Sequence, residues 1–174
     1  MNHHKRHEQP LPAKSETNLK SHADPYPSYP LSPTNDLITL FITWTTYGTW
    51  LPGDSRGWQK SKAGLQQSQP MLENWCRERL NEKPIVLNPE QRTRVENVIG
   101  EHARHRQWFL HAVSARSNHI HVAITASSKP QQVRDQLKAN STRVLRQPPC
   151  ALINERIWTR GGDIRFIDSE EDLE

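Results

Sequence analysis

Residues 118–124 read Asn-His-Ile-His-Val-Ala-Ile, so every second residue from 120 onward is a large aliphatic one. Successive side chains of a β-strand point to opposite faces, so this spacing predicts a strand that buries Ile120, Val122 and Ile124. The same strand presents His119 and His121 on its other face. The run therefore favours a sheet with one buried face and one face left for chemistry.

His119 and His121 are candidate metal ligands. Neutral imidazole nitrogens suit Mn, Co, Ni or Zn, and with oxygen ligands they can help hold Mg. Two co-facing imidazoles can bind one ion, but two ligands are too few on their own. Paired surface histidines or hydrogen-bonded histidines are the alternative interpretation of the same pattern.

Hydrophobic periodicity and turn signals predict an ordered series of elements. The expected elements are a strand over 37–44, a loop over 45–58, a short helix over 71–80, a helix from Asn88 to about 106, a strand over 108–114, the histidine strand, a helix from Ser128 to about 146, and a strand over 163–167. Asn88 with Gln91, and Ser128 with Gln131, have the spacing of capping boxes. Without the short helix the order is β-α-β-β-α-β, which predicts a ferredoxin-like antiparallel sheet with helices on one face and the histidine strand in its interior.

The composition predicts that part of the chain is unfolded. Only 33% of the 174 residues are hydrophobic, and residues 1–35 are rich in Pro, Ser and His with no periodic pattern. We therefore expect a disordered tail over 1–35 and one folded domain over 36–174. No stretch is apolar enough to cross a bilayer or to act as a signal core, so we expect no membrane partner and a cytoplasmic protein, with Cys76 and Cys150 as reduced thiols.

The charge distribution favours a polyanionic partner. The net charge is +4, yet the last twelve residues contain six acidic residues and one arginine, leaving +9 for the rest of the chain. A basic body of this size suits nucleic acid, although a solvated basic surface gives the same composition.

Three segments together resemble a known group of proteins. They are Phe41 to Trp58 (FITWTTYGTWLPGDSRGW), Ser117 to Ile124 (SNHIHVAI) and Trp158 to Glu174 (WTRGGDIRFIDSEEDLE). In this order, with the histidine triplet on a strand, they resemble the single-tyrosine transposases of the HUH endonuclease superfamily, namely the insertion sequence 200-like group and the REP-associated tyrosine transposases. The resemblance covers the chain from about Leu37 to Glu174.

The resemblance implies a reaction, a cofactor and partners. His119 and His121 would hold one divalent ion, Mg or Mn, that orients the scissile phosphate of single-stranded or hairpin DNA. A tyrosine on the last helix would attack that phosphate to give a 5′-phosphotyrosine, and the protein would act as a homodimer.

The position of the tyrosines departs from that pattern. Tyr26, Tyr29 and Tyr47 are the only tyrosines, and all precede His119. The nucleophile would lie after Glu174, on a helix that begins at Ser169 and is left incomplete, so we expect a truncated chain without its catalytic tyrosine or third metal ligand. We expect Tyr47 to be a packing or stacking aromatic rather than a substitute nucleophile.

Other residues are candidate DNA contacts because aromatic faces stack on unpaired bases and guanidinium or ammonium groups bind phosphates. These residues are Tyr47, Trp50, Arg56, Trp58, Arg134, Lys138 and Arg160. Core packing of the aromatics, a solvated helix face and a flexible Gly-Gly turn are the respective alternatives.

Three functions follow from these observations. The first is a transposase-like protein that binds single-stranded or hairpin DNA with a metal at the histidine pair. The second is a non-catalytic hairpin-DNA-binding module or inactive transposase remnant. The third is a metal-dependent phosphoesterase that uses activated water and needs no tyrosine.

Overall fold

The computed structural model describes residues 37–60, 63–149 and 151–167. Its main sheet has four strands in the order β4-β5-β1-β6, every neighbouring pair antiparallel. The strands are β1 (Ile38–Thr45), β4 (Phe109–Ala115), β5 (His119–Ala126) and β6 (Asp163–Phe166). The histidine strand β5 lies between β4 and β1, which confirms its predicted interior position.

One face of the sheet forms the hydrophobic core. On β5, Ile120, Val122 and Ile124 are all 0% exposed, as their alternation predicted. Leu40, Ile42 and Trp44 on β1 oppose these residues across the strand pair and are also buried. Burial of large aliphatic side chains contributes about 1.5–3 kcal/mol each, so this face is what holds the central strands in register.

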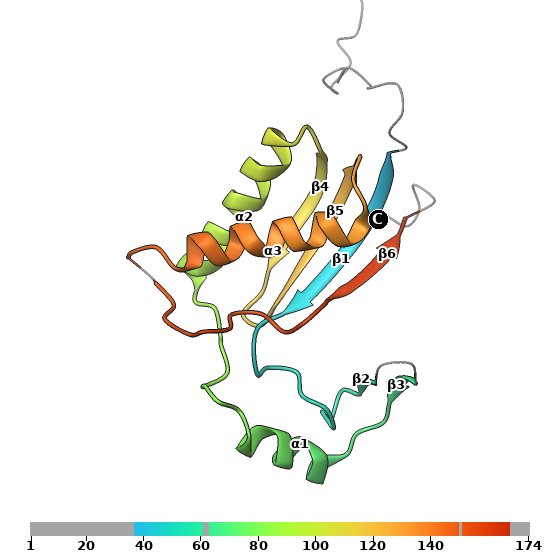
Figure 1. The fold of residues 1–174 in the computed structure, drawn as a ribbon, viewed down its shortest axis with the longest axis vertical. Helices are drawn as coiled ribbons and strands as arrows, with labels where there is room; N and C mark the ends of the chain where they lie inside the picture. Colours follow the sequence, from blue (N-terminus) through green and yellow to red (C-terminus); the bar gives the residue numbers. More distant parts are fainter. Residues whose placement is uncertain (1–36, 61–62, 150, 168–174) are drawn as a thin grey trace, which may run out of the picture. The chain divides into compact units, whose positions relative to one another are not determined.

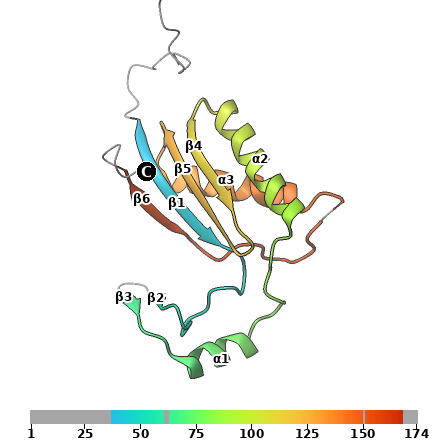
Figure 2. The same ribbon diagram turned by 180° about the vertical axis from the view of Figure 1, so that it is seen from behind.

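Helices α2 (Pro89–His105) and α3 (Pro130–Leu145) cover that buried face, and Figures 1 and 2 show both helices on the same side of the sheet. The start of α2 is the predicted capping box. The Gln91 backbone N–H donates to Asn88 Oδ1 at 2.8 Å, and the Asn88 N–H donates to Gln91 Oε1 at 3.0 Å. The helices bury the following side chains: Val95, Val98, Ile99 and Ala103 from α2, and Val133, Leu137, Ser141 and Leu145 from α3.

The predicted capping box of α3 is wrong. Lys129, not Ser128, is the N-cap residue, and no side chain makes a capping hydrogen bond there. Pro130 takes the first helical position because its fixed φ suits a helix start, which places Gln131 one position too early for a capping box. The buried stripe, rather than a cap, defines this helix.

The element order confirms the predicted ferredoxin-like arrangement. β1 and β4 are joined through α2 with β5 inserted between them, and β5 returns through α3 to β6 at the opposite edge of the sheet. All four main strands were predicted, with bounds within two residues of those observed.

Between β1 and α2 the chain makes an excursion over residues 46–87. It contains α1 (Pro70–Glu78), close to the predicted short helix, and a two-stranded hairpin of β2 (Trp58–Lys60) and β3 (Gly64–Gln66). This hairpin was not predicted from the sequence. Its strands have three residues each and Leu65 is 69% exposed, so they carry no apolar alternation that could reveal them.

Two sequence predictions fall outside the described residues. These are the tail over 1–35 and the helix expected to begin at Ser169. Within the described residues, no helix combines the length and the apolar character needed to cross a membrane.

Candidate functional site

The histidine pair lies on the sheet face opposite the two helices. His119 and His121 follow each other on this face of β5, and their ring centroids are 4.6 Å apart. On β1, Thr45 and Thr43 are their respective partners in the strand register. Phe41, the next β1 residue on the same face, stacks on the His121 ring at a centroid distance of 5.5 Å. The predicted co-facing arrangement of the two imidazoles is therefore what the structure has.

Each imidazole is oriented through its Nδ1 atom. His119 Nδ1 lies 2.8 Å from Asn118 Oδ1, which can only accept, so this Nδ1 carries the proton and Nε2 keeps its lone pair. His121 Nδ1 lies 2.9 Å from Thr43 Oγ1. In the tautomer with the proton on Nδ1, the Thr43 hydroxyl accepts this hydrogen bond and Nε2 of His121 keeps its lone pair. Oriented imidazoles of this kind are typical of metal ligands.

The local electrostatics favour the neutral form of both rings. Burial lowers the pKa of His119 below its ordinary value, and the nearby His121, Arg116 and Arg56 lower it further. Burial and Arg116 likewise lower the pKa of His121. A metal ligand must be unprotonated, so both side chains are in the form that binds a cation at neutral pH.

The donor set fits a metal site in part. Two neutral imidazoles suit a divalent transition ion. Among the described residues, however, no group of three or more His, Cys, Asp or Glu side chains gathers where it could hold one ion. The described residues would therefore offer such an ion two imidazole ligands, His119 and His121.

The loop that follows β1 is fastened to the start of β5. The Asn118 carbonyl accepts from the Thr46 N–H at 2.9 Å, and Thr46 Oγ1 donates to Ile85 O at 2.7 Å. Thr46 is completely buried. The residue that orients His119 with its side chain thus anchors the loop with its backbone.

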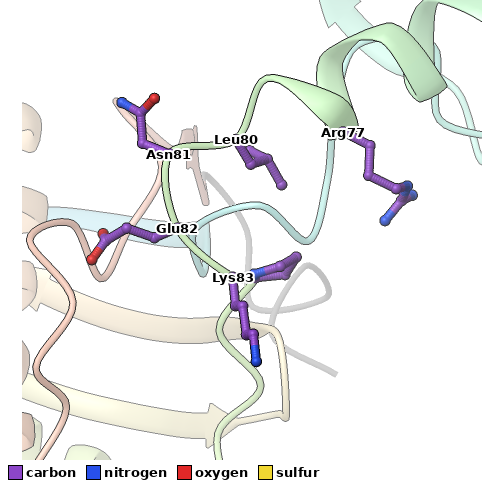
Figure 3. A pocket seen from close by; sticks show the side chains of 6 residues that line it. Arg77, Leu80, Asn81, Glu82 and Lys83 are labelled. Carbon is purple, nitrogen blue, oxygen red and sulfur yellow. The ribbon is translucent and has the colours of Figure 1, made fainter.

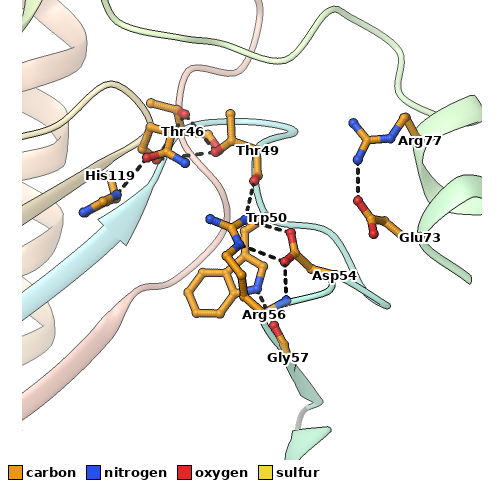
Figure 4. Close-up of polar contacts among 10 residues, drawn as sticks. Thr46, Thr49, Trp50, Asp54, Arg56, Gly57, Glu73, Arg77 and His119 are labelled. Atoms are coloured by element: carbon orange, nitrogen blue, oxygen red, sulfur yellow. Dashed lines mark hydrogen bonds and ion pairs between the residues drawn. The ribbon is translucent and has the colours of Figure 1, made fainter. Parts of the chain in front are cut away.

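Within this loop a buried carboxylate holds an arginine. Arg56 donates to both oxygens of Asp54, from Nε at 2.8 Å and from Nη2 at 2.7 Å, and Nη2 also donates to Thr49 O at 3.0 Å. The Asp54 side chain is 8% exposed and that of Arg56 57%. The hydrogen bonds from Arg56 hold the pKa of Asp54 below its ordinary value, against the effect of burial. Figure 4 shows the guanidinium between Asp54 and Thr49, on the side of the loop that faces His119.

The turn that carries this pair depends on a glycine. Gly53 has φ +91°, and a Cβ atom there would lie 2.4 Å from Gln69 O. Only glycine fits both the positive φ and the close approach. Across this turn, the Trp50 indole lies under Arg56, with 5.8 Å between the ring centroid and the guanidinium carbon, and Trp50 Nε1 donates to Gly57 O at 2.7 Å.

These parts meet in one cavity of about 270 Å³, which we call the histidine cavity. It is lined by Thr43, Thr45, Trp50, Arg56, Asn118, His119 and His121. It brings together four of the predicted site residues, namely both histidines, Trp50 and Arg56. Thr43, Thr45 and Asn118 were not among the predicted site residues, although the alternation of β1 could have placed the two threonines on one face.

The remaining predicted residues lie elsewhere. Trp58 lines a smaller hollow beside the histidine cavity. The Tyr47 ring is partly buried against the core and its hydroxyl accepts from the Asn81 N–H at 3.2 Å, as expected of a packing aromatic. Lys138 donates to Thr159 O at 2.8 Å and to Gly161 O at 2.6 Å, and burial, helped by Arg134, lowers its pKa to about 8.

Arg134 and Arg160 do not line the histidine cavity either. Arg134 pairs with Asp135 at 2.9 Å, and Arg160 is exposed in the turn before β6. A role of these residues and of Lys138 in DNA contact stays a prediction.

A larger hollow of about 420 Å³ lies after α1 and is lined by Arg77, Leu80, Asn81, Glu82, Lys83 and Pro84 (Figure 3). Several of its polar groups already have partners. Arg77 pairs with Glu73, and the Glu82 carboxylate accepts from the Glu155 backbone N–H at 3.0 Å. It contains none of the predicted site residues, so we place the functional site at the histidine cavity.

Comparison with known proteins identifies the family. The model of the IS200-like transposase family matches residues 75–168, more than half of the chain. Among solved structures, a REP-associated tyrosine transposase bound to a REP hairpin is similar at 13% identity and a TM-score of 0.43, covering 84% of this chain and 66% of that one. A candidate transposase from Deinococcus radiodurans R1 is similar at 12% identity and a TM-score of 0.42, covering 83% of this chain and 89% of that one.

This chain thus spans just under two thirds of the first of these structures. Comparison with curated proteins gives no match. The family match runs from α1 to β6 and includes the histidine pair. The chain belongs to the IS200-like transposase family.

Proposed function

We propose that this protein binds single-stranded or hairpin DNA at the histidine cavity and holds a divalent ion, Mg²⁺ or Mn²⁺, with His119 and His121. The observation that carries the proposal is the orientation of the two imidazoles. Asn118 and Thr43 engage both Nδ1 atoms and leave both Nε2 atoms for a cation. Membership of a transposase family and the basic body of the chain support DNA as the partner.

The residues of the cavity have separate tasks in this proposal. A bound divalent ion would polarise a phosphoryl oxygen as a Lewis acid. Arg56, fixed by Asp54, would neutralise phosphate charge, and the Trp50 ring would contact an unpaired base. No tyrosine lines the cavity among the described residues, so the proposal assigns this part of the chain to binding and orienting the phosphate. The family resemblance also implies a wider activity, namely DNA strand cleavage through a phosphotyrosine intermediate. It further implies that the protein acts as a homodimer.

Metal binding tests the proposal directly. We expect the wild-type chain to bind Mn²⁺, measured by the loss of the free-ion electron paramagnetic resonance signal. His119→Ala and His121→Ala should each weaken this binding at least tenfold. His111→Ala is the matched control, because its Nε2 lies 2.8 Å from Thr125 Oγ1, away from the histidine cavity, and its pKa is likewise lowered by burial. Equal losses in all three variants would contradict the assignment.

DNA binding provides the second measurement. Fluorescence anisotropy of a labelled hairpin with a single-stranded flank should show binding that Mn²⁺ strengthens and the double variant His119→Ala plus His121→Ala weakens. Binding that is unaffected by Mn²⁺ and by the double variant would instead favour the second candidate, a DNA-binding module that needs no metal. That candidate is supported by the absence of a third ligand among the described residues, and it predicts a steep loss of affinity with added salt.

A further inference from the structure

A smaller hollow of about 130 Å³ adjoins the histidine cavity and is walled by Trp50, Trp58, Gln59 and Thr159 together with Pro52 and Thr45. Thr45 and Trp50 line both spaces, so the two are neighbours across these side chains. A strand whose phosphate reaches the histidine pair therefore has this hollow beside it. The proposal above places an unpaired base at Trp50 and assigns no ligand to Trp58, Gln59 or Thr159.

The two tryptophans of the hollow have fixed rings. Trp50 Nε1 donates to Gly57 O at 2.7 Å, and Trp58 Nε1 donates to Gln67 O at 3.1 Å. Because backbone carbonyls occupy both indole N–H groups, the rings offer their faces rather than their donors. Trp50 is 40% exposed although it is a large apolar side chain. Fixed, exposed indole faces are the surfaces on which unpaired bases stack.

The hollow also has polar groups suited to a base edge. Gln59 is exposed, and its amide makes no hydrogen bond within the described part of the chain. Among the other lining residues, Thr45 Oγ1 and Thr159 Oγ1 lie 2.8 Å apart, and the Thr159 N–H donates to Thr45 O at 3.0 Å. The free amide carries both a donor and an acceptor, which is the pair needed to read a base edge.

Charge at the boundary of the hollow matches a sugar–phosphate backbone. The Arg56 guanidinium lies over Trp50, the residue shared by the two spaces, and Asp54 holds it there. The Arg56 side chain as a whole is 57% exposed. A phosphate bound at Arg56 would therefore bring its nucleotide close to the ring of Trp50.

We propose that this hollow binds one unpaired nucleobase next to the phosphate held at the histidine cavity, with Trp50 and Trp58 stacking on the base and Gln59 contacting its edge. The inference rests on the proposed function, because it requires a single strand at the histidine pair. It deepens the contact proposed for Trp50 into a subsite that selects between bases.

The test compares two strands of equal length and charge, a labelled oligothymidylate and an abasic oligomer, in the presence of Mn²⁺. Stacking of a base on an aromatic side chain contributes about 1–3 kcal/mol, so wild type should bind the oligothymidylate roughly tenfold more tightly. Trp50→Ala and Trp58→Ala should remove most of this preference. Trp75→Ala is the matched control, because Trp75 is 53% exposed on α1 and lines neither space.

A second variant keeps the test independent of loop stability. Gln59→Ala removes an exposed amide that makes no hydrogen bond to the described residues. It should change the ranking of oligothymidylate, oligocytidylate and oligoadenylate while leaving the abasic strand's affinity unchanged. Equal wild-type affinity for base-bearing and abasic strands would overturn the base subsite alone. An equal effect of Trp75→Ala would also overturn it, and failure of wild type to bind either strand would overturn the proposed function as well.

Discussion

The two faces of β5 have different roles, since one is buried in the core and the other lines the histidine cavity. Ile120, Val122 and Ile124 are fully buried against the helices, whereas His119 and His121 remain partly exposed beside a cavity. Along β5, residues that stabilise the sheet therefore alternate with residues that line the candidate site. Successive side chains of a strand point to opposite faces and contact different residues. Substitutions on one face of β5 can therefore change stability, and substitutions on the other face can change ligand binding.

The largest expected effect is on the buried face. Ile120→Ala should lower the free energy of unfolding by about 2–5 kcal/mol, because it leaves a cavity among fully buried side chains. His121→Ala on the other face should change it by less than about 1 kcal/mol. Urea denaturation followed by circular dichroism measures both, and similar losses in the two variants would break the contrast between the faces.

A middle-sized effect is expected on the open face. Thr43→Val keeps the shape of the side chain but removes the hydroxyl 2.9 Å from His121 Nδ1. Loss of such an orienting group typically costs 10–100-fold in metal affinity, and we expect a Mn²⁺ titration to show a loss in that range.

Thr39→Val is the control for this substitution. Thr39 lies on the same face of β1, but its hydroxyl bonds Thr125 Oγ1 at 2.8 Å and not a histidine of the pair. A Mn²⁺ affinity that falls equally in the two variants would mean that the open face acts as a whole rather than through His121.

The smallest expected effect concerns the loop beside the open face. Asp54→Asn should cost about 1 kcal/mol of unfolding free energy at neutral pH, because it weakens the charge-assisted bonds to Arg56. The folded-state pKa of Asp54 is below its ordinary value of 3.8, so its contribution is complete above that value and is lost as the pH falls through the lowered pKa. Denaturation at neutral and at strongly acidic pH should show the difference between wild type and variant disappear in acid. A difference that persists there would assign it to packing rather than to charge.

The sequence predicted the features that depend on near neighbours along the chain. The alternation around His119 gave the faces of β5, and the spacing of Asn88 and Gln91 gave the start of α2 in atomic detail. These signals are local, since a strand repeats every two residues and a cap spans one helical turn.

The sequence did not predict features that depend on distant residues. Thr43 and His121 are 78 positions apart, and only the register of β1 against β5 brings them together. The ion pair of Asp54 and Arg56 joins residues two positions apart, so it is local. Its position beside His119, however, depends on the hydrogen bond between the Thr46 N–H and the Asn118 carbonyl. The β2–β3 hairpin is held by backbone pairing without a buried stripe, so its side chains carry no periodic signal.

Asn118 joins two parts of the site that the sequence keeps more than 60 positions apart. Its side chain orients His119, and its carbonyl holds Thr46 at the start of the loop that carries Trp50 and Arg56. Asn118 therefore links the orientation of the His119 imidazole directly to the position of the loop. A DNA strand that displaced the loop would also displace Asn118, the residue that orients His119. DNA binding at the loop and the geometry of the proposed metal site are therefore coupled through Asn118.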